Sequence, residues 1–206
     1  MTAPTPTVFV VDDYAPVRSS ISRLLRGAGF AVVAFASAEE FLAQYDPLAV
    51  GCLVLDLAMP SLNGLELQHV LAKAGSLLPI IFLTGHADIP KGVQAMKHGA
   101  SDFLTKPVND EDLLAAVRVA IEKDRVLQRE QAELSEIRAR LARLTPRERE
   151  VLEYVVAGKL NKQIAGDLGT VEQTVKVHRG HVMEKMRVRS VAELVRLTQR
   201  CGISAR

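Results

Sequence analysis

The 206-residue chain has an ordinary composition for a globular protein, with 48% apolar and 24% charged residues. Its apolar runs are far shorter than the ~20 residues of a membrane span, and its first residues lack the basic start and long apolar run of a signal peptide. Cys52 and Cys201 have no partner at metal or redox spacing, which is typical of a reducing compartment. We therefore expect a cytoplasmic protein with one large domain or two small ones.

Charge is distributed unevenly along the chain. Residues 1–122 contain 8 Lys and Arg against 13 Asp and Glu, a net charge of −5. Residues 123–206 contain 18 against 11, a net charge of +7. The acidic part suggests a cation or phosphoryl site, and the basic part suggests a polyanionic partner. Chance clustering would give the same split, so the motifs must decide between the two interpretations.

Strand-like and helix-like segments alternate through the first half of the chain. Short apolar runs with β-branched residues occur at 8–11, 31–35, 52–55, 80–83 and 102–104, and helical patterns lie between them. This alternation predicts an α/β fold, a parallel sheet with helices on both faces. Five such units have the size of a flavodoxin-like domain, whose functional groups gather at the carboxyl ends of the strands.

A long helix and an all-α region are predicted for the second half. Residues 110–144 contain no Gly or Pro, which favours a helix longer than the first domain requires. Thr145, Pro146 and Glu148 have the pattern of an N-cap, a first helical residue and a capping box. We expect a first domain at 1–122, a helical linker at 123–143 and an all-α domain at 144–206.

The linker carries an apolar heptad pattern. Its members are Leu127, Leu134, Ile137, Leu141 and Leu144, and Glu130 is the one break in the pattern. Such a stripe suits a coiled-coil seam between two chains, but it suits equally a single helix packed on its own all-α domain. Two to three heptads are too short for stable pairing alone, so a seam would only assist a contact made elsewhere.

Polar side chains end four of the predicted strands. They are Asp12, Asp13, Asp56, Thr84 and Lys106. Clustered carboxylates repel one another unless a cation neutralises them, and oxygen ligands suit Mg²⁺. A lysine and a hydroxyl nearby would bind phosphoryl oxygens, so the set suits phosphoryl transfer to a carboxylate.

The same residues carry a family resemblance. The motifs VVDD (10–13), LDLAMP (55–60) with Gly64, Thr84-Gly85 and FLTKP (103–107) resemble the receiver domain of response regulators across residues 7–122. The resemblance implies that Asp56 accepts the phosphoryl group. It also implies that Mg²⁺ is bound by Asp13 and Asp56, by Asp12 directly or through water, and by the backbone carbonyl of Ala58.

The resemblance assigns roles to the last two strands as well. Thr84 and Lys106 would hold the phosphoryl group, Lys106-Pro107 would be a cis peptide, and Phe103 would move inward together with Thr84. Ala58 and His86 would flank the path of the hydrolytic water, and because Ala58 cannot orient it, we expect slow dephosphorylation. A phosphatase of the haloacid dehalogenase type would need a second acid where Ala58 stands, which disfavours an enzyme.

The segment from Leu144 onward resembles the LuxR/FixJ-type helix-turn-helix family. It includes LTPREREVL, NKQIAGDL and TVKVHRGHVMEKM. Gly169 permits a tight turn before a third helix at about 172–186. We therefore predict a flavodoxin-like five-stranded parallel-sheet receiver, joined by a long helix to an all-α helix-turn-helix domain.

The third helix has two faces. Val175, Val182 and Met186 form a core stripe, and a second set lies opposite, free to enter a major groove. In that set, Lys176 would bind guanine O6/N7 and Val177 a thymine methyl. The full set of expected DNA-facing residues is Gln173, Lys176, Val177 and Gly180, with Asn161, Lys162, Thr174 and Arg179 placed for phosphates.

Two positions on or beside this helix depart from the usual pattern of the family, and a pair of histidines needs separate comment. Val171 stands where a serine N-cap is common, which leaves Thr170 as the nearest capping residue. Gly180 stands on the groove face where some relatives carry a longer polar residue. His178 and His181 are three residues apart, but without a third ligand nearby they indicate packing or a phosphate contact rather than a metal site.

Together the motifs predict a transcription factor switched by phosphorylation rather than an enzyme. A sensor histidine kinase, double-stranded operator DNA and RNA polymerase are the expected partners, with a homodimer forming on phosphorylation. The run TGHADIP (84–90) resembles the FixJ-type subgroup. Two other hypotheses stay open: an inactive receiver on a constitutive DNA binder, and a protein-binding module that uses its helix-turn-helix surface.

Overall fold

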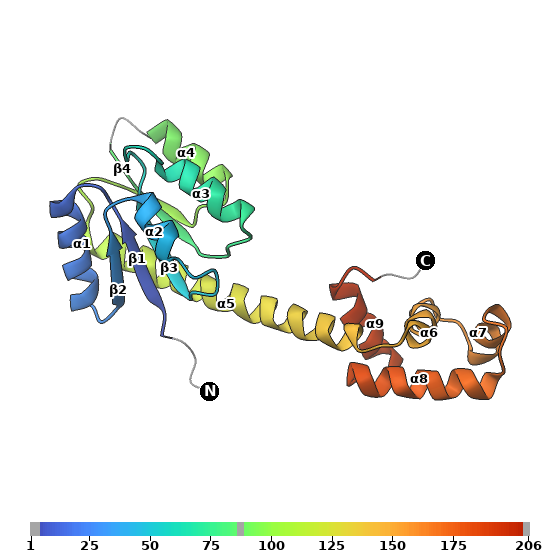
Figure 1. The fold of residues 1–206 in the computed structure, drawn as a ribbon. Coiled ribbons are helices and arrows are strands. Elements are labelled where there is room, and N and C mark those ends of the chain that lie inside the picture. Colours follow the sequence, from blue (N-terminus) through green and yellow to red (C-terminus); the bar gives the residue numbers. More distant parts are fainter. Residues whose placement is uncertain (1–4, 86–88, 204–206) are drawn as a thin grey trace. The chain divides into compact units, whose positions relative to one another are not determined.

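The computed structural model describes residues 5–85 and 89–203 (Figure 1). The chain divides into two compact units, Met1–Gln128 and Arg129–Arg206. Within the described residues, no helix combines the length and the apolar character needed to cross a bilayer.

The first unit is built on a five-stranded parallel sheet, as predicted. Its strands lie in the order β2-β1-β3-β4-β5, and every pair is parallel. All residues of β3 and β4 are buried, because helices cover both faces of the central strands. The strands are β1 (Thr7–Val11), β2 (Ala31–Phe35), β3 (Gly51–Asp56), β4 (Ile80–Thr84) and β5 (Asp102–Thr105).

Alternating side chains divide the interior of this unit into two cores. On β3, Cys52 and Val54 point to one face, and Leu53 and Leu55 point to the other. The first face packs against α1 and α5, and the second packs against α2, α3 and α4 (Figure 1). These helices are α1 (Ala15–Gly27), α2 (Ala38–Gln44), α3 (Gly64–Lys73), α4 (Ile89–Lys97) and α5 (Asp110–Ala142).

The second unit is all-α and has its own core. Thr145 accepts from the Glu148 N–H and the Glu148 side chain accepts from the Thr145 N–H, which is the predicted capping box, with Pro146 in the first turn. Buried side chains from α6, α7, α8 and α9 form a single cluster. The helices are α6 (Pro146–Val156), α7 (Asn161–Asp167), α8 (Glu172–Met186) and α9 (Val191–Arg200).

The heptad stripe of the linker is largely used within one chain. Ile137, Leu141 and Leu144 are buried in the core of the second unit. Leu127 and Leu134 are half-buried. Of the two interpretations of the stripe, packing on the chain's own all-α domain therefore holds for its last three members, and the other two remain available for a further contact.

A buried carboxylate ties α5 to the start of β3. Asp124 is fully buried, and its Oδ2 accepts from the Gly51 N–H at 2.8 Å. Position 51 requires glycine, because its φ is +143° and a Cβ there would lie 1.8 Å from the Thr7 carbonyl oxygen. Burial raises the pKa of Asp124, despite the hydrogen bonds from Gly51 and Gln128.

Substitutions at Asp124 should separate its hydrogen bond from its charge. Asp124→Ala leaves the buried Gly51 N–H without an acceptor and should lower the free energy of unfolding by about 1–3 kcal/mol. Asp124→Asn keeps an acceptor and carries no buried charge, so it should be at least as stable as the wild type at pH 7. Urea unfolding followed by circular dichroism measures both changes.

The pH dependence gives a second test of the same residue. Because burial raises the pKa of Asp124 above 3.8 in the folded state, the folded protein holds this proton more tightly than the unfolded chain. Its contribution to stability is therefore complete below pH 3.8 and is lost as the pH rises through the raised value. The Asn variant should lack this loss, and an unchanged pH profile would contradict the assignment.

Candidate functional site

Three carboxylates meet at the carboxyl edge of the sheet. Asp12 and Asp13 follow β1, and Asp56 ends β3, the strand paired with β1. One carboxylate oxygen from each lies within 4.8 Å of the others. Asp12 and Asp56 are buried, whereas Asp13 is exposed. The cluster therefore combines two acids held by the fold with one that faces solvent.

Lys106 supplies the opposite charge from the end of β5. Its Nζ lies 2.8 Å from Asp12 Oδ2 and 3.0 Å from Asp56 Oδ2. Burial disfavours the charged ammonium, but the hydrogen bonds to the two carboxylates outweigh it and raise the pKa of Lys106. The side chain is therefore a stable cation between two acids.

Asp12 is the acid most affected by its surroundings. Burial raises the pKa of Asp12, and the hydrogen bonds from Lys106 and from the Tyr14 N–H only partly offset this. A further cation placed beside such a carboxylate would stabilise its ionised form.

The other strand-end residues lie where the sheet order places them. Thr84 is fully buried, and its Oγ1 donates to the Gly85 carbonyl at 3.2 Å. Phe103 on β5 is half-buried against the core that contains α4. Lys106-Pro107 is a cis peptide. Ala58 is exposed, and its N–H lies 3.4 Å from Asp56 Oδ1.

Two further residues fix the backbone of the acidic cluster. The Arg18 Nη1 on α1 donates to the Asp12 carbonyl at 2.6 Å and to the Asp13 carbonyl at 3.3 Å. Gly64 starts α3 so close to the strand end that a Cβ would lie 2.6 Å from the Asp56 carbonyl oxygen. Gly64 belongs to the predicted motif, but sequence reasoning missed Arg18, whose only signal is its place one turn into the helix after the two acids.

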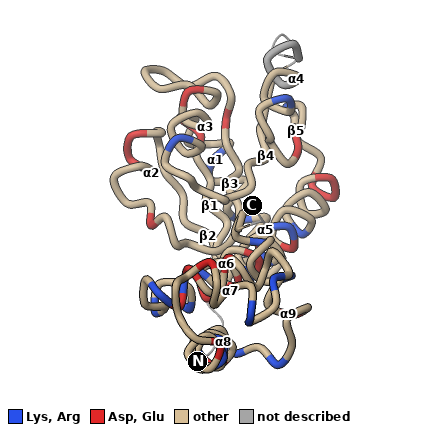
Figure 2. Tube along the Cα trace, turned by 90° about the vertical axis from the view of Figure 1, so that its right-hand side faces the viewer, with Lys and Arg blue, Asp and Glu red and all other residues tan. Residues whose placement is uncertain are grey.

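In the second unit, α8 has the two faces expected of it. Val175, Val182 and Met186 are fully buried. Gln173, Lys176, Val177 and Gly180 are exposed. Lys and Arg recur along α8 and α9 (Figure 2). The rest of this unit therefore leaves the outer face of α8 uncovered, and a partner molecule can contact it.

Polar contacts connect α8 to the other helices of its unit. The Arg179 Nη1 donates to Asn161 Oδ1 of α7 at 2.9 Å. Lys185 donates to the buried Glu148 Oε2 of α6 at 2.6 Å, and this bond, with the Thr145 N–H, lowers the pKa of Glu148 despite its burial. Of the remaining expected phosphate contacts, Thr174 is half-buried and Lys162 is exposed.

The two histidines of α8 do not converge on a metal. The His178 Nδ1 is buried and has no hydrogen-bond partner in the described part of the chain. His181 is exposed, with its Nδ1 3.6 Å from Glu148 Oε1. Among residues 5–85 and 89–203, the only group of three acid, His or Cys side chains close enough to share an ion is Asp12, Asp13 and Asp56.

The N-terminus of α8 has no side-chain cap. Val171 occupies the N-cap position, and no side chain accepts from the first turn, so Thr170 does not replace the missing serine.

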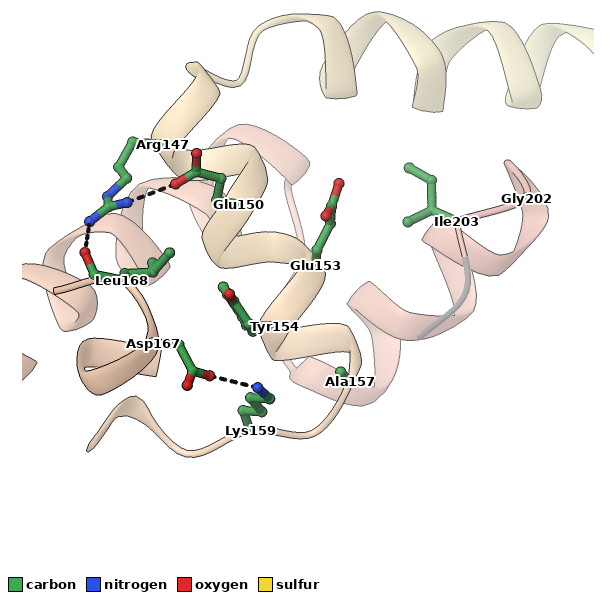
Figure 3. Close-up of a pocket in the computed structure, with 10 residues that line it drawn as sticks. All are labelled: Arg147, Glu150, Glu153, Tyr154, Ala157, Lys159, Asp167, Leu168, Gly202 and Ile203. Carbon is green, nitrogen blue, oxygen red and sulfur yellow. Dashed lines mark hydrogen bonds and ion pairs between the residues drawn. The ribbon is translucent and has the colours of Figure 1, made fainter. Parts of the chain in front are cut away.

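A groove of about 810 Å³ lies beside α6 (Figure 3). Four of its charged side chains form two ion pairs, Arg147 with Glu150 and Lys159 with Asp167. The Lys159 Nζ also lies 4.7 Å from the centre of the Tyr154 ring. These ion pairs leave few free polar groups in the groove to select a ligand.

Comparison with known proteins assigns both units. Residues 8–118 match the response regulator receiver domain family, and residues 142–198 match the bacterial regulatory proteins, luxR family. Nodulation protein W of Bradyrhizobium diazoefficiens is 48% identical over 96% of this chain and 87% of that protein. The transcriptional regulatory protein FixJ of the same organism is 43% identical, over 95% of this chain and 96% of that protein.

Solved structures agree with the sequence relatives. The response regulator StyR covers 96% of this chain and all of its own, with a TM-score of 0.86 and 44% identity. Full-length FixJ from B. japonicum covers 97% of this chain and 98% of its own, with a TM-score of 0.60 and 42% identity. The chain is a response regulator of the LuxR/FixJ type.

This membership confirms the predicted fold and the general function. The regulator has a flavodoxin-like receiver and a LuxR-type DNA-binding domain, and it regulates transcription under the control of phosphorylation. It is not an enzyme of the ordinary kind, and its two domains imply a histidine kinase and DNA as partners. His86, expected to flank the hydrolytic water, and most of the FixJ-like run after Gly85 lie outside the described residues, so slow dephosphorylation stays a prediction.

Proposed function

We propose that Asp56 accepts the phosphoryl group from a sensor histidine kinase. The position of the Lys106 ammonium, within 3.0 Å of both Asp12 and Asp56, carries this proposal. An Asp56 carboxylate oxygen would form the new P–O bond while the P–N bond to the kinase histidine breaks, and the histidine nitrogen takes up a proton. Lys106 would then neutralise the phosphoryl oxygens.

The acidic cluster fits a resident Mg²⁺. Three carboxylates supply hard oxygen donors, and the exposure of Asp13 leaves room for the water ligands that this ion keeps. Asp12, Asp13, Asp56 and the Ala58 carbonyl would hold it. The ion would offset the charge of the incoming phosphoryl group, which Lys106 alone cannot do.

Thr84 and Phe103 would form the switch. The Thr84 hydroxyl donates to its neighbour's carbonyl, so it must exchange this hydrogen bond for one to the phosphoryl group. Its movement would vacate space into which the half-buried Phe103 ring turns. Such an exchange between two packed arrangements is the common basis of a two-state switch.

The exposed face of α8 would read the operator. In this arrangement Lys176 binds guanine, Val177 contacts a thymine methyl, and Gln173 lies beside them at the base edges. Asn161, Lys162, Thr174 and Arg179 would contact phosphates, with Asn161 orienting the Arg179 guanidinium. RNA polymerase would be recruited at the bound promoter, and the regulator would act in the cytoplasm. Its functional segments would be a receiver domain at 1–122, a helical linker at 123–143 and a DNA-binding domain at 144–206.

Phosphorylation would make the regulator a homodimer through the receiver. Val93 and Met96 on α4 are 46% and 38% exposed and offer an apolar surface beside the proposed switch. Leu127 and Leu134 of α5, half-buried, would add a weaker contact.

Replacement of Asp56 tests the phosphoacceptor. Asp56→Asn keeps the shape of the side chain but removes the nucleophile, so labelling by acetyl phosphate with Mg²⁺ should fall to background. Circular dichroism should show an unchanged fold. Asp46→Asn, which alters an exposed acid, should label normally, and chelation of Mg²⁺ should abolish labelling of the wild type. Equal labelling of Asp56→Asn and the wild type would show that Asp56 is not the phosphoacceptor.

Two lysine substitutions test the division of DNA contacts. Lys176→Ala should cost about 1–3 kcal/mol of specific binding and relax the sequence preference. Lys162→Ala should weaken binding to all sequences alike and reduce the salt slope by about one phosphate's worth. Fluorescence anisotropy with operator variants at several salt concentrations measures both. Identical behaviour of the two variants would show that the roles are wrongly divided.

Charges placed on the two apolar surfaces test the dimer. Val93→Asp should weaken the phosphorylated dimer at least about tenfold, because an unpaired charge would be buried at the interface. Leu134→Glu should weaken it less, and neither change should prevent phosphorylation of Asp56. Sedimentation velocity of the phosphorylated proteins decides the matter. A full-strength dimer in Leu134→Glu would mean that α5 packs only within its own chain.

A further inference from the structure

A glycine occupies the middle of the helix that faces the DNA. Gly180 is exposed and lies within α8, which is continuous from Glu172 to Met186. Glycine in a helix interior costs conformational entropy that alanine does not. Glycine at position 180 therefore destabilises the helix relative to alanine, and its presence requires an explanation.

The fold of the DNA-binding domain does not supply that reason. Apart from the adjoining backbone of α8 itself, no atom lies within 4 Å of a Cβ built on Gly180, and its φ is not positive. Gly64 differs, because there a Cβ would meet the backbone at 2.6 Å. Neither packing nor a turn requires glycine at position 180.

Gly180 lies on the face of α8 turned away from the core. It follows Val177 by three residues and precedes Glu184 by four, so the three share one side of the helix. Val177 is 47% exposed and Glu184 is exposed. The buried stripe of Val175, Val182 and Met186 faces the opposite way. Any group that contacts Gly180 would therefore come from outside this domain.

We propose that Gly180 is the point where the α8 backbone approaches the DNA most closely, with no room for a side chain. This rests on the proposed entry of α8 into the major groove. Without a Cβ, the helix surface recedes by about 1.5 Å, which brings the backbone against a deoxyribose or a base edge. Gly180 thereby sets how deeply the Lys176 and Val177 side chains enter the major groove.

A size series at position 180 separates this contact from fold stability. Gly180→Ala should raise the thermal midpoint of the DNA-binding domain by about 2–5 °C but weaken DNA binding about threefold, because its Cβ would hold the helix away from the DNA. Gly180→Gln and Gly180→Lys should remain folded but bind at least about tenfold more weakly. The lysine variant is decisive, because its added positive charge would otherwise tighten binding.

Gly166 on α7 provides the matched control. It too is helical and exposed, and no atom lies within 4 Å of a Cβ built on it. Gly166→Ala and Gly166→Gln should change stability as the variants at 180 do, but leave affinity within about twofold. The full-length chain, phosphorylated with acetyl phosphate, is used with a duplex that the wild type selects from a randomised library.

Lys176→Ala distinguishes failure of this proposal from failure of the groove assignment. If Lys176→Ala weakens binding while Gly180→Gln and Gly180→Lys bind as tightly as the wild type, close approach at Gly180 is wrong and α8 still reads DNA. If Lys176→Ala has no effect either, α8 does not enter the groove and both proposals fall. Equal losses at positions 166 and 180 would also overturn the close approach.

Discussion

Two buried carboxylates at the ends of neighbouring strands impose the main constraint on the receiver. Asp12 and Asp56 are held close together in a desolvated place, where their repulsion is strong. Lys106 relieves it from β5, two strands away from β3 in the sheet. The strand order, the close packing of Gly64 and the hold of Arg18 on the backbone all serve this cluster. A cation, or a phosphoryl group together with a metal ion, would stabilise a fold that holds two acids together. The site would therefore respond to the binding of these groups.

Much of this arrangement could be predicted from the sequence because parallel strands end at one edge. Once the strand ends were placed, Asp12, Asp56, Thr84 and Lys106 had to lie near one another. The contact of Asp124 with Gly51 could not be predicted in this way, because 73 residues separate the partners and no periodic pattern links them. Arg18 bonds to backbone carbonyls, and such bonds leave no pattern in the sequence.

The heptad stripe shows a different limit of prediction from sequence. A repeat of seven describes which residues share a face, but it says nothing about what covers that face. Ile137 and Leu141 are covered by the chain's own α6, α7, α8 and α9 core, so they cannot also form a seam between chains without exposing that core. Only tertiary packing distinguishes the two outcomes. The same helix contributes Leu113 and Val117 to the receiver core, so α5 belongs to both folding units.

Helix α8 departs in several places from the residue preferences of α-helices. It lacks a side-chain N-cap, carries Gly180 in its interior and ends at Arg187 in the left-handed conformation, with φ at +55°. Each feature costs a helix of the order of 1 kcal/mol. Burial of Val175, Val182 and Met186 and the bond from Lys185 to Glu148 outweigh these costs. A helix held by its core rather than by its own sequence leaves its outer face free to vary, and in the proposed function this is the face that would contact DNA.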